Sequence, residues 1–477
     1  MVFSQPPFLF YFLPLVLLAY HLAPAPGRNL LLVVVSVVFY AWSSSDALGI
    51  LGVSILGNYL LGVALAKTAG GARRHTATGI AGCAVAFNLA LLGYFKYANF
   101  AVSQLDLALR LMGQQSLPWM NVALPVGISF YTFHSLSYII DVHRLRTPAF
   151  FNPVHYALYV VFFPQLIAGP IIRFHQIAPQ IQMRSSGWES LGRGAVRFCF
   201  GLAKKTLVAD RIGEIATAVF AAPAAQLDAP TAWLGALAYT FQLYFDFSGY
   251  SDMAIGLGRM FGFQFPENFL RPYSATSITD FWRRWHVTLS AWFRDYLYIP
   301  LGGSHRGTVR SYANLVLVFL ATGLWHGASW TFVVWGAYHG ALLIAERLTG
   351  LRTTTEAGSY APLRRAVTFT LVVLGWVLFR ANDLGHATVF YQAMFSFHSG
   401  TVSDAVQAAF TYRNAITMAA AATVVFFPRD FFSGTWLVEG DGLTAAVART
   451  VLLAAAFPLS LLAVVASDFH PFLYFRF

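Results

Sequence analysis

The chain has 477 residues, of which 57% are hydrophobic and 11% are charged, whereas about 25% are charged in a typical globular domain. So few charges cannot cover the surface of a soluble fold, and we expect lipid to surround most of the chain. The net charge of +11 fits basic loops at a membrane surface better than nucleic-acid binding, because the arginines cluster between apolar stretches.

Three apolar stretches open the chain, at 8–22, 30–42 and 47–66. A membrane-spanning helix needs about 20 mainly apolar residues, so each stretch can cross with help from its borders. We expect no cleaved signal peptide, because no basic residue precedes the first stretch and no small-residue cleavage site follows it. Lys67, Arg73 and Arg74 follow the third stretch, which predicts a cytosolic loop there and an N-terminus outside.

The stretch 156–172 is apolar but does not resemble an ordinary span. Pro164 and Pro170 interrupt it, and basic residues such as Arg146 and Arg173 lie on both sides of it. We therefore predict a segment that enters the membrane and returns to the same side. Such backbone is tolerated where protein or water surrounds it.

Further candidate spans follow at 79–98, 122–141, 196–222, 231–260, 312–326, 328–346, 366–380, 410–427 and 446–466. The pattern predicts an all-α polytopic membrane protein with about twelve transmembrane helices. We interpret 1–477 as one membrane-embedded domain: N-terminal helices at 1–150, a catalytic core at 151–350 and C-terminal helices at 351–477. The absence of an internal sequence repeat argues against an inverted-repeat transporter.

Residues 277–300 differ from all of these spans. Ser277, with Asp280 three residues later, resembles a helix-capping box, and aromatic residues recur at helical spacing. Polar side chains fall on another face of the same predicted helix: Arg283, His286, Ser290 and Arg294. We predict one amphipathic helix at the membrane interface or beside an aqueous cavity, on the cytosolic side because arginines surround it.

Three stretches concentrate ionisable groups, which are costly inside a membrane and tend to be functional. They are QLYFDFSGYSD (242–252) with Asp246, the interfacial helix with His286, and GLWHGASWTFVVWGAYHG (323–340) with His326. His326 is the strongest candidate, because a neutral imidazole beside small residues can take a proton from a hydroxyl nucleophile. The alternative is that His326 only bonds a carbonyl between two helices. For His339 we favour a structural role.

Other enzyme classes lack their motifs in this sequence: there is no GxSxG elbow, HExxH pair or GxxxxGK[ST] loop. Cys83 and Cys199 lie far apart and predict neither a disulfide framework nor a zinc site. We therefore expect no metal centre.

Three strings resemble the membrane-bound O-acyltransferase (MBOAT) family: FPQLIAGPIIRF (163–174), DFWRRWHVTLSAWFRDYLYIPLGG (280–303) and GLWHGASWTFVVWG (323–336). The opening MVFSQPPFLFYFLPL and the ending HPFLYFRF are similar to its bacterial alginate O-acetylation branch, so the likeness covers nearly the whole chain. The same strings also resemble a related branch that moves D-alanine onto teichoic acids, which stays open as an alternative. The resemblance implies a ring of helices around a thinned centre, with a funnel for the acyl donor.

The resemblance also implies roles for particular residues. His326 matches the family's catalytic histidine, and His286 matches a second functional histidine of bacterial members. The substrate-binding candidates are Arg283, Arg294, Trp285, Trp325 and Asp246. Arg283 and Arg294 suit the phosphates of a coenzyme A donor; alternatively, they pair with Asp280 and Asp295 and only anchor the interfacial helix.

The implied function is acyl transfer without a bound cofactor, with acetyl-CoA as the donor substrate. We expect the protein in the bacterial inner membrane, moving acetyl from a cytosolic thioester toward O-acetylation of an exported polysaccharide such as alginate. The expected partners are membrane lipid and a periplasmic O-acetyltransferase or acyl-acceptor protein of an export complex, and we expect no nucleic acid. A transporter or flippase, or a scaffold without chemistry, stays open as an alternative.

Overall fold

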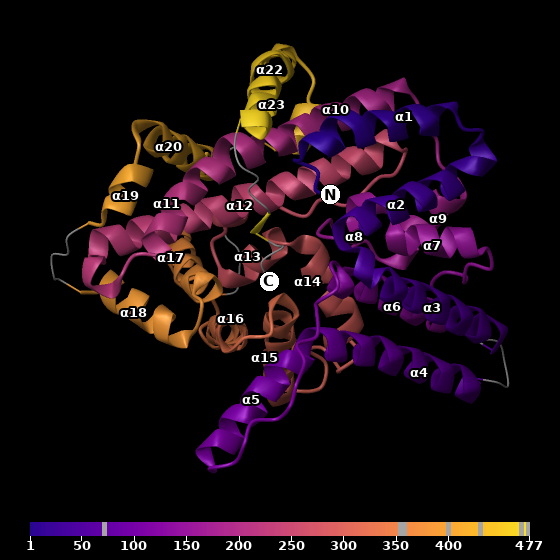
Figure 1. The fold of residues 1–477 in the computed structure, drawn as a ribbon, viewed down its shortest axis with the longest axis horizontal. Helices are drawn as coiled ribbons and strands as arrows, with labels where there is room; N and C mark the ends of the chain where they lie inside the picture. Colours follow the sequence, from indigo (N-terminus) through magenta and orange to yellow (C-terminus); the bar gives the residue numbers. More distant parts are fainter. Residues whose placement is uncertain (69–73, 352–359, 397–401, 428–432, 467–471, 474–477) are drawn as a thin grey trace. The chain divides into compact units, whose positions relative to one another are not determined.

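The computed structural model describes residues 1–68, 74–351, 360–396, 402–427, 433–466 and 472–473. Every regular element in these ranges is a helix (Figure 1), so the prediction of an all-α protein is confirmed for them. Arg73 of the predicted cytosolic cluster, and all of the ending 470–477 except 472–473, lie outside the described residues.

The chain divides into two compact units. The first unit contains Met1–Leu191 and Gly258–Phe265, and the second contains Gly192–Leu257 and Pro266–Phe477. The subdivision at residues 150 and 350 stays a prediction.

The helices of the first unit begin with the π-helical turn Phe8–Phe12, which continues into α1 (Leu13–Leu22). The others are α2 (Arg28–Ser44), α3 (Leu48–Thr68), α4 (Arg74–Leu92), α5 (Ala98–Leu111), α6 (Ile128–His143), α7 (Pro153–Val161), α8 (Phe163–Leu166) and α9 (Phe174–Gln182). In Figure 1, α3, α4 and α6 pack side by side, and α2 packs on α7. Pro24 and Pro26 separate α1 from α2, since proline ends one helix and starts the next.

The helix in the predicted re-entrant stretch is interrupted next to Pro164, the first proline of that stretch. Helix α7 ends at Val161, Phe162 is not helical, and Pro164 lies in the first turn of the short helix α8. All four residues of α8 are buried, and the chain then runs without helix to α9. The break at Pro164 is thus confirmed, whereas the return of this segment to the same membrane side stays a prediction.

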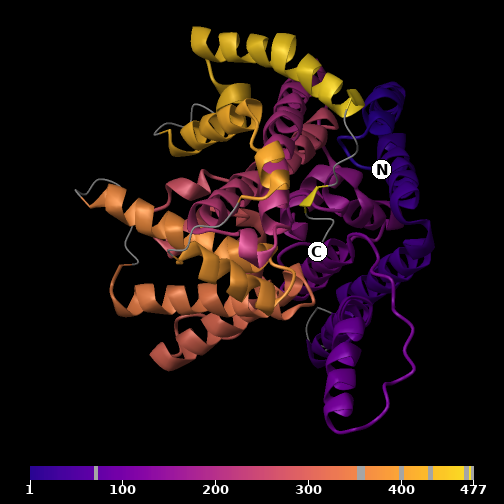
Figure 2. The ribbon, with the colours of Figure 1, turned by 60° about the vertical axis from the view of Figure 1, so that its left-hand side comes forward.

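The helices of the second unit are α10 (Trp188–Ala203, which begins in the first unit), α11 (Asp210–Phe220), α12 (Ala229–Met260, which ends in the first unit), α13 (Ile278–Arg284), α14 (Val287–Phe293), α15 (Thr308–His326), α16 (Trp330–Leu348), α17 (Ala361–Arg380), α18 (Leu384–Met394), α19 (Asp404–Ala409), α20 (Tyr412–Phe426), α21 (Gly434–Glu439), α22 (Leu443–Val451) and α23 (Phe457–Ala466). A π-helical turn, Lys204–Ala209, joins α10 to α11. Another, Leu452–Ala456, joins α22 to α23, and the resulting rod is yellow at the top of Figure 2.

Four described stretches are long and apolar enough to cross a membrane: Ala25–Thr68, Arg74–Leu111, Ala361–Arg380 and Leu443–Ala466. A shorter apolar helix covers Phe8–Leu22. Helix α2 exposes Leu30, Val34 and Val38, as expected of a lipid-facing helix. The predicted span at 122–141 starts too early, because α6 begins at Ile128, and the total of about twelve crossings stays a prediction.

The prediction of one continuous amphipathic helix over 277–300 is wrong. Helix α13 ends at Arg284, Trp285 is extended, and His286 is left-handed (φ 44°, ψ 53°) before α14 begins at Val287. One left-handed residue interrupts the helical hydrogen bonds but leaves the spacing of aromatic residues unchanged, so periodicity does not reveal it. The predicted start is correct, because the Ser277 Oγ atom accepts a hydrogen bond from the Asp280 amide at 3.0 Å.

Helices α10 and α12 are in backbone contact in the second unit. A Cβ atom added at Gly201 would lie 2.5 Å from the carbonyl oxygen of Gly249, so only glycine permits this approach. The contact lets cations of α10 and the following π-helical turn reach carboxylates of α12. Arg197 and Lys204 each lie 2.6 Å from Asp252.

A reciprocal amide pair holds α3 against α4 in the first unit. The Asn88 Nδ2 atom donates to Asn58 Oδ1 at 2.6 Å, Asn58 Nδ2 donates to Asn88 Oδ1 at 3.1 Å, and both side chains are buried. We expect Asn88→Leu to lower the free energy of unfolding by about 1 kcal/mol, because Asn58 loses its partner. The double variant, with leucine at both positions, should lose less free energy of unfolding than the sum of the losses in the two single variants. Thermal unfolding of purified protein measures this, and strictly additive losses would contradict it.

Candidate active site

His326 is positioned by a tight hairpin of helices α15 and α16. A Cβ atom at Gly323 would lie 2.2 Å from the carbonyl oxygen of Phe332, and one at Gly336 would lie 2.3 Å from that of Phe319. The two helices can therefore approach this closely only with glycine at both contacts. His326 is the last residue of α15 and is held at the closed end of this hairpin.

The His326 side chain lies in an aromatic enclosure and is 6% exposed. Its ring centroid lies 4.9 Å from that of Trp325, 5.2 Å from Trp335 and 5.0 Å from Phe379. A cavity of about 20 Å³ opens beside it, room for a single water molecule. The residues lining this His326 cavity include two other predicted site residues, Asp246 and Trp285.

The Asp246 carboxylate is held by two strong contacts. Lys205 Nζ lies 2.6 Å from Oδ1, and the backbone N–H of Leu473 donates to Oδ2 at 2.8 Å. Lys205 also pairs with Asp210 at 2.7 Å. Asp246 is thus a fixed, ion-paired wall of the His326 cavity, and its predicted role in substrate binding stays a prediction. Lys205 was missed from the sequence, because nothing in its spacing points to a carboxylate on another helix.

His286 is fully buried at the break between α13 and α14. Its ring lies edge-on to Phe247, with centroids 4.8 Å apart, and Phe247 also lines the His326 cavity. The indole of Trp325 contacts both histidines, with centroids 5.9 Å from His286 and 4.9 Å from His326. The two predicted catalytic histidines therefore share Trp325 as a common neighbour.

The amide of Asn268 fixes the proton on the His286 ring. Asn268 Oδ1 accepts from the N–H and the hydroxyl of Thr288, at 3.3 and 2.9 Å, and its Nδ2 donates to the Ser251 hydroxyl at 3.1 Å. His286 Nδ1 lies 3.1 Å from this same oxygen, so Nδ1 carries the proton. The lone pair is then on Nε2, which has no hydrogen-bond partner among the described residues.

Burial lowers the pKa of His286 to about 3, so the ring is neutral at neutral pH. A neutral imidazole with its lone pair on Nε2 can accept a proton. Sequence reasoning missed Asn268, which lies in a loop between Pro266 and Pro272 with no periodicity to mark it. The loop also contains the charged residues Glu267 and Arg271, so a polar side chain at 268 did not distinguish itself from its neighbours.

Arg283 and Arg294 line a separate cavity of about 360 Å³, which we call the arginine chamber. Arg347 and Thr322 line it too, and Thr322 lies about one turn before His326 on α15. His286 is not among the lining residues, so the prediction that it lies beside Arg283 and Arg294 on one polar face is wrong. The left-handed backbone at residue 286 turns the ring inward instead.

The predicted anchoring ion pairs are present in part. Arg294 lies 2.7 Å from Asp295, whereas Asp280 pairs with Arg284 at 2.8 Å rather than with Arg283. Both predicted tryptophans are buried around the histidines: Trp325 contacts both rings, and Trp285 lines the His326 cavity. The phosphate role of Arg283 and Arg294 stays a prediction.

Comparison with known proteins identifies the family of this chain. Residues 96–378 match the model of the MBOAT, membrane-bound O-acyltransferase family. Over the full length of both chains, the protein is 45% identical to "Probable alginate O-acetylase AlgI" of Azotobacter vinelandii. It is 37% identical to the peptidoglycan O-acetyltransferase of Helicobacter pylori, over 81% of this chain and 78% of the relative. It is 28% identical to the teichoic acid D-alanyltransferase of Streptococcus thermophilus, over 54% of this chain and 69% of the relative.

The protein is therefore a membrane-bound acyltransferase. The chain belongs to the MBOAT family, and full-length similarity places it among relatives named for alginate O-acetylation.

The hydrogen-bond network around Asn268 predicts a measurable state of His286. In ¹⁵N-histidine NMR of the purified protein, the His286 signal, identified by its loss in His286→Gln, should show protonated Nδ1 and unprotonated Nε2 at pH 7. Asn268→Asp should raise the His286 pKa markedly, because a carboxylate beside Nδ1 favours the imidazolium ion. Ser251→Ala, which removes only the contact to Asn268 Nδ2, is the control. A proton on Nε2 in the wild type would contradict the assignment.

Proposed function

We propose that the protein transfers acetyl groups from a cytosolic thioester donor across the inner membrane, toward O-acetylation of an exported polysaccharide. The observation that carries this proposal is the enclosure of His326: a nearly buried imidazole beside a small cavity, with the neutral His286 ring across Trp325. A water-poor site of this kind favours transfer to a chosen acceptor over hydrolysis of the donor.

In the proposed reaction His326 acts as general base. It takes the proton of an acceptor hydroxyl while the hydroxyl oxygen attacks the thioester carbonyl carbon. The C–S bond then breaks, the new C–O bond remains, and the departing thiolate receives the proton. No covalent enzyme intermediate is needed, because the thioester is already activated. For His286, the position outside the arginine chamber favours a part in proton transfer over direct donor binding.

The donor we propose is acetyl-CoA, with its phosphates near Arg283 and Arg294 in the arginine chamber. Arginine forks bind phosphate through charge-assisted hydrogen bonds. A third arginine, Arg347, lines the same chamber, and Thr322 links its wall to the helix that ends in His326. We place this chamber on the cytosolic side, because arginines cluster around α13 and α14.

For the acceptor side we propose a periplasmic protein that passes the acetyl group to alginate or a similar polymer. The names of the full-length relatives support O-acetylation, whereas the relatives named for D-alanyl transfer are 28% identical and match only part of this chain. A transporter, a flippase or an export scaffold remains the alternative, and such a protein would not need His326 for chemistry.

His326→Ala should reduce polymer acetylation by at least about 100-fold, the loss expected for a missing general base. Acetylation in cells and the amount of folded protein in the membrane are measured together. His339→Gln is the matched control, because His339 also packs on Trp335 and accepts from Trp282 Nε1 at 3.3 Å. This control should lose stability while each folded molecule keeps its activity. Normal acetylation by a well-folded His326→Ala protein would favour the scaffold or transporter.

Arg283→Gln should raise the acetyl-CoA concentration needed for half-maximal rate by roughly three- to tenfold, because one charge-assisted phosphate contact is lost. At high salt, the acetyl-CoA requirements of the variant and the wild type should become more similar. Salt screens the contact between Arg283 and phosphate, which only the wild type makes. Arg306→Gln, an exposed residue outside the chamber, is the control. An unchanged donor requirement in a well-folded Arg283→Gln protein would remove the phosphate role.

A further inference from the structure

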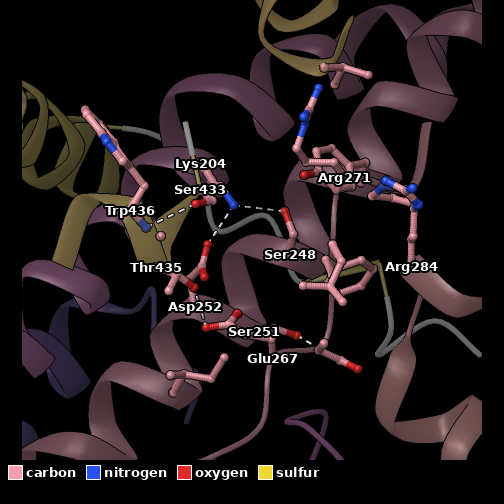
Figure 3. A pocket seen from close by; sticks show the side chains of 18 of the residues that line it. Lys204, Ser248, Ser251, Asp252, Glu267, Arg271, Arg284, Ser433, Thr435 and Trp436 are labelled. Atoms are coloured by element: carbon pink, nitrogen blue, oxygen red, sulfur yellow. Dashed lines mark hydrogen bonds and ion pairs between the residues drawn. The ribbon is translucent and has the colours of Figure 1, made fainter. Parts of the chain in front are cut away.

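Helix α13 borders two cavities of the second unit, and two consecutive arginines of this helix line different cavities. Arg283 lines the arginine chamber, whereas Arg284 lines a larger cavity of about 600 Å³ beside α12. Figure 3 shows the larger cavity, with Arg284 labelled at the right. Consecutive residues of an α-helix point about 100° apart. The rotation of α13 about its own axis therefore decides which arginine faces which cavity.

The internal contacts of α13 do not set this rotation. Ser277 caps the first turn, and Asp280 pairs with Arg284 at 2.8 Å, but both contacts stay within the same segment. The helix has only seven residues, and a helix so short depends on its neighbours for its place in the fold. Arg283 forms no ion pair among the residues that the structure describes. Its position on the chamber wall therefore follows from how α13 packs.

The carboxylate of Glu346, from α16, binds the first turn of α13 with both of its oxygens. Oε2 accepts from the N–H of Thr279 at 2.9 Å and from the Thr279 hydroxyl at 2.8 Å, and Oε1 accepts from the N–H of Ile278. The first N–H groups of a helix have no partner inside the helix, and hydrogen bonds to a carboxylate are among the strong ones. Glu346 thus satisfies two backbone donors and one side-chain donor at once.

A second contact joins the same two helices two turns away. The indole Nε1 of Trp282 donates to His339 Nδ1 at 3.3 Å, and Trp282 is buried. His339 and Glu346 are seven residues apart, so they lie on the same face of α16. A single contact would let α13 turn about it, whereas two contacts along one face of α16 fix the rotation of α13.

We propose that Glu346 is a positioning residue for acetyl-CoA binding, because it fixes the rotation of α13 at which Arg283 faces the arginine chamber. Glu346 is not among the residues that line this chamber, so it acts through Arg283 and does not touch acetyl-CoA. This inference rests on the phosphate-binding role proposed above for the chamber, and it adds the contact that makes this role possible.

The test is equilibrium binding of coenzyme A to the purified full-length protein in a neutral detergent. Glu346→Gln keeps the size of the side chain but has one acceptor oxygen, so it cannot bind Ile278 and Thr279 as the carboxylate does. We expect coenzyme A binding to weaken by roughly three- to tenfold, and by no more than in Arg283→Gln. In an Arg283→Gln background the same change should cause no further loss, because the contact that it disturbs is already absent.

Turnover gives a second readout. Glu346→Gln should raise the acetyl-CoA concentration needed for half-maximal rate and leave the rate at saturating acetyl-CoA unchanged. The reason is that His286 and His326 are held by other contacts, the Asn268 amide and the glycines of the α15–α16 hairpin.

Glu214→Gln is the matched control. Glu214 lies on α11 in the same unit, its Oε2 atom accepts from Asn414 Nδ2 at 2.7 Å, and it lines neither cavity. This variant should lower the unfolding temperature and bind coenzyme A like the wild type. If Glu346→Gln does not fold, Glu346→Asp, which keeps both carboxylate oxygens, takes its place in the same series.

The outcomes separate this inference from the proposed function. If a folded Glu346 variant binds coenzyme A like the wild type, the positioning role is overturned while the chamber keeps its proposed role. An equal loss with and without Arg283 also overturns it, since Glu346 would then act on the fold in general. If Arg283→Gln itself binds coenzyme A like the wild type, the phosphate role of the chamber fails and the inference fails with it.

Discussion

Ion pairing between α10, the π-helical turn that follows it, and α12 is the interaction on which the candidate site depends. A charge inside an apolar protein is stable only when it is paired and hydrogen-bonded. Lys205 pairs with Asp246, while Arg197 and Lys204 pair with Asp252. These contacts fix the rotation of α12 about its axis. As a result, α12 presents Asp246 to the His326 cavity, while Ser248 and Asp252 of the same helix line a second cavity.

The two histidines differ in what holds them. His326 is placed by backbone packing, since glycines in α15 and α16 let the hairpin close around it. His286 is placed by a strained left-handed backbone and by the Asn268 amide. Trp325 lies against both rings. Two independent sets of contacts therefore hold the two histidines in place before any substrate binds. This suits a reaction in which a proton acceptor must keep one tautomer in a site that excludes water.

Much of the site was predictable because its residues are chemically unusual for their surroundings. His326, Asp246 and Trp285 were all predicted from the sequence, and the structure brings them to one cavity. Arg283 and Arg294 were also predicted, and both line the arginine chamber. Asn268 and Lys205 were not predicted, because their importance lies in partners 18 and 41 residues away. Such pairings follow from how helices pack, and one sequence contains no direct record of that packing.

The sequence by itself determined the class of environment and the helical content, because an apolar chain with so few charges must satisfy its backbone internally in lipid. The sequence also located most helices. The length of an apolar stretch and the positions of its prolines affect helix formation within that stretch, so they can be interpreted without knowing how the chain packs. The tertiary structure alone decided that the helix over 277–300 breaks at His286. The residues on both sides of that break keep helical spacing, so the periodic pattern persists through it. Asn268, from the loop before α13, stabilises the left-handed turn, because its oxygens accept hydrogen bonds from the Val287 and Thr288 amides there.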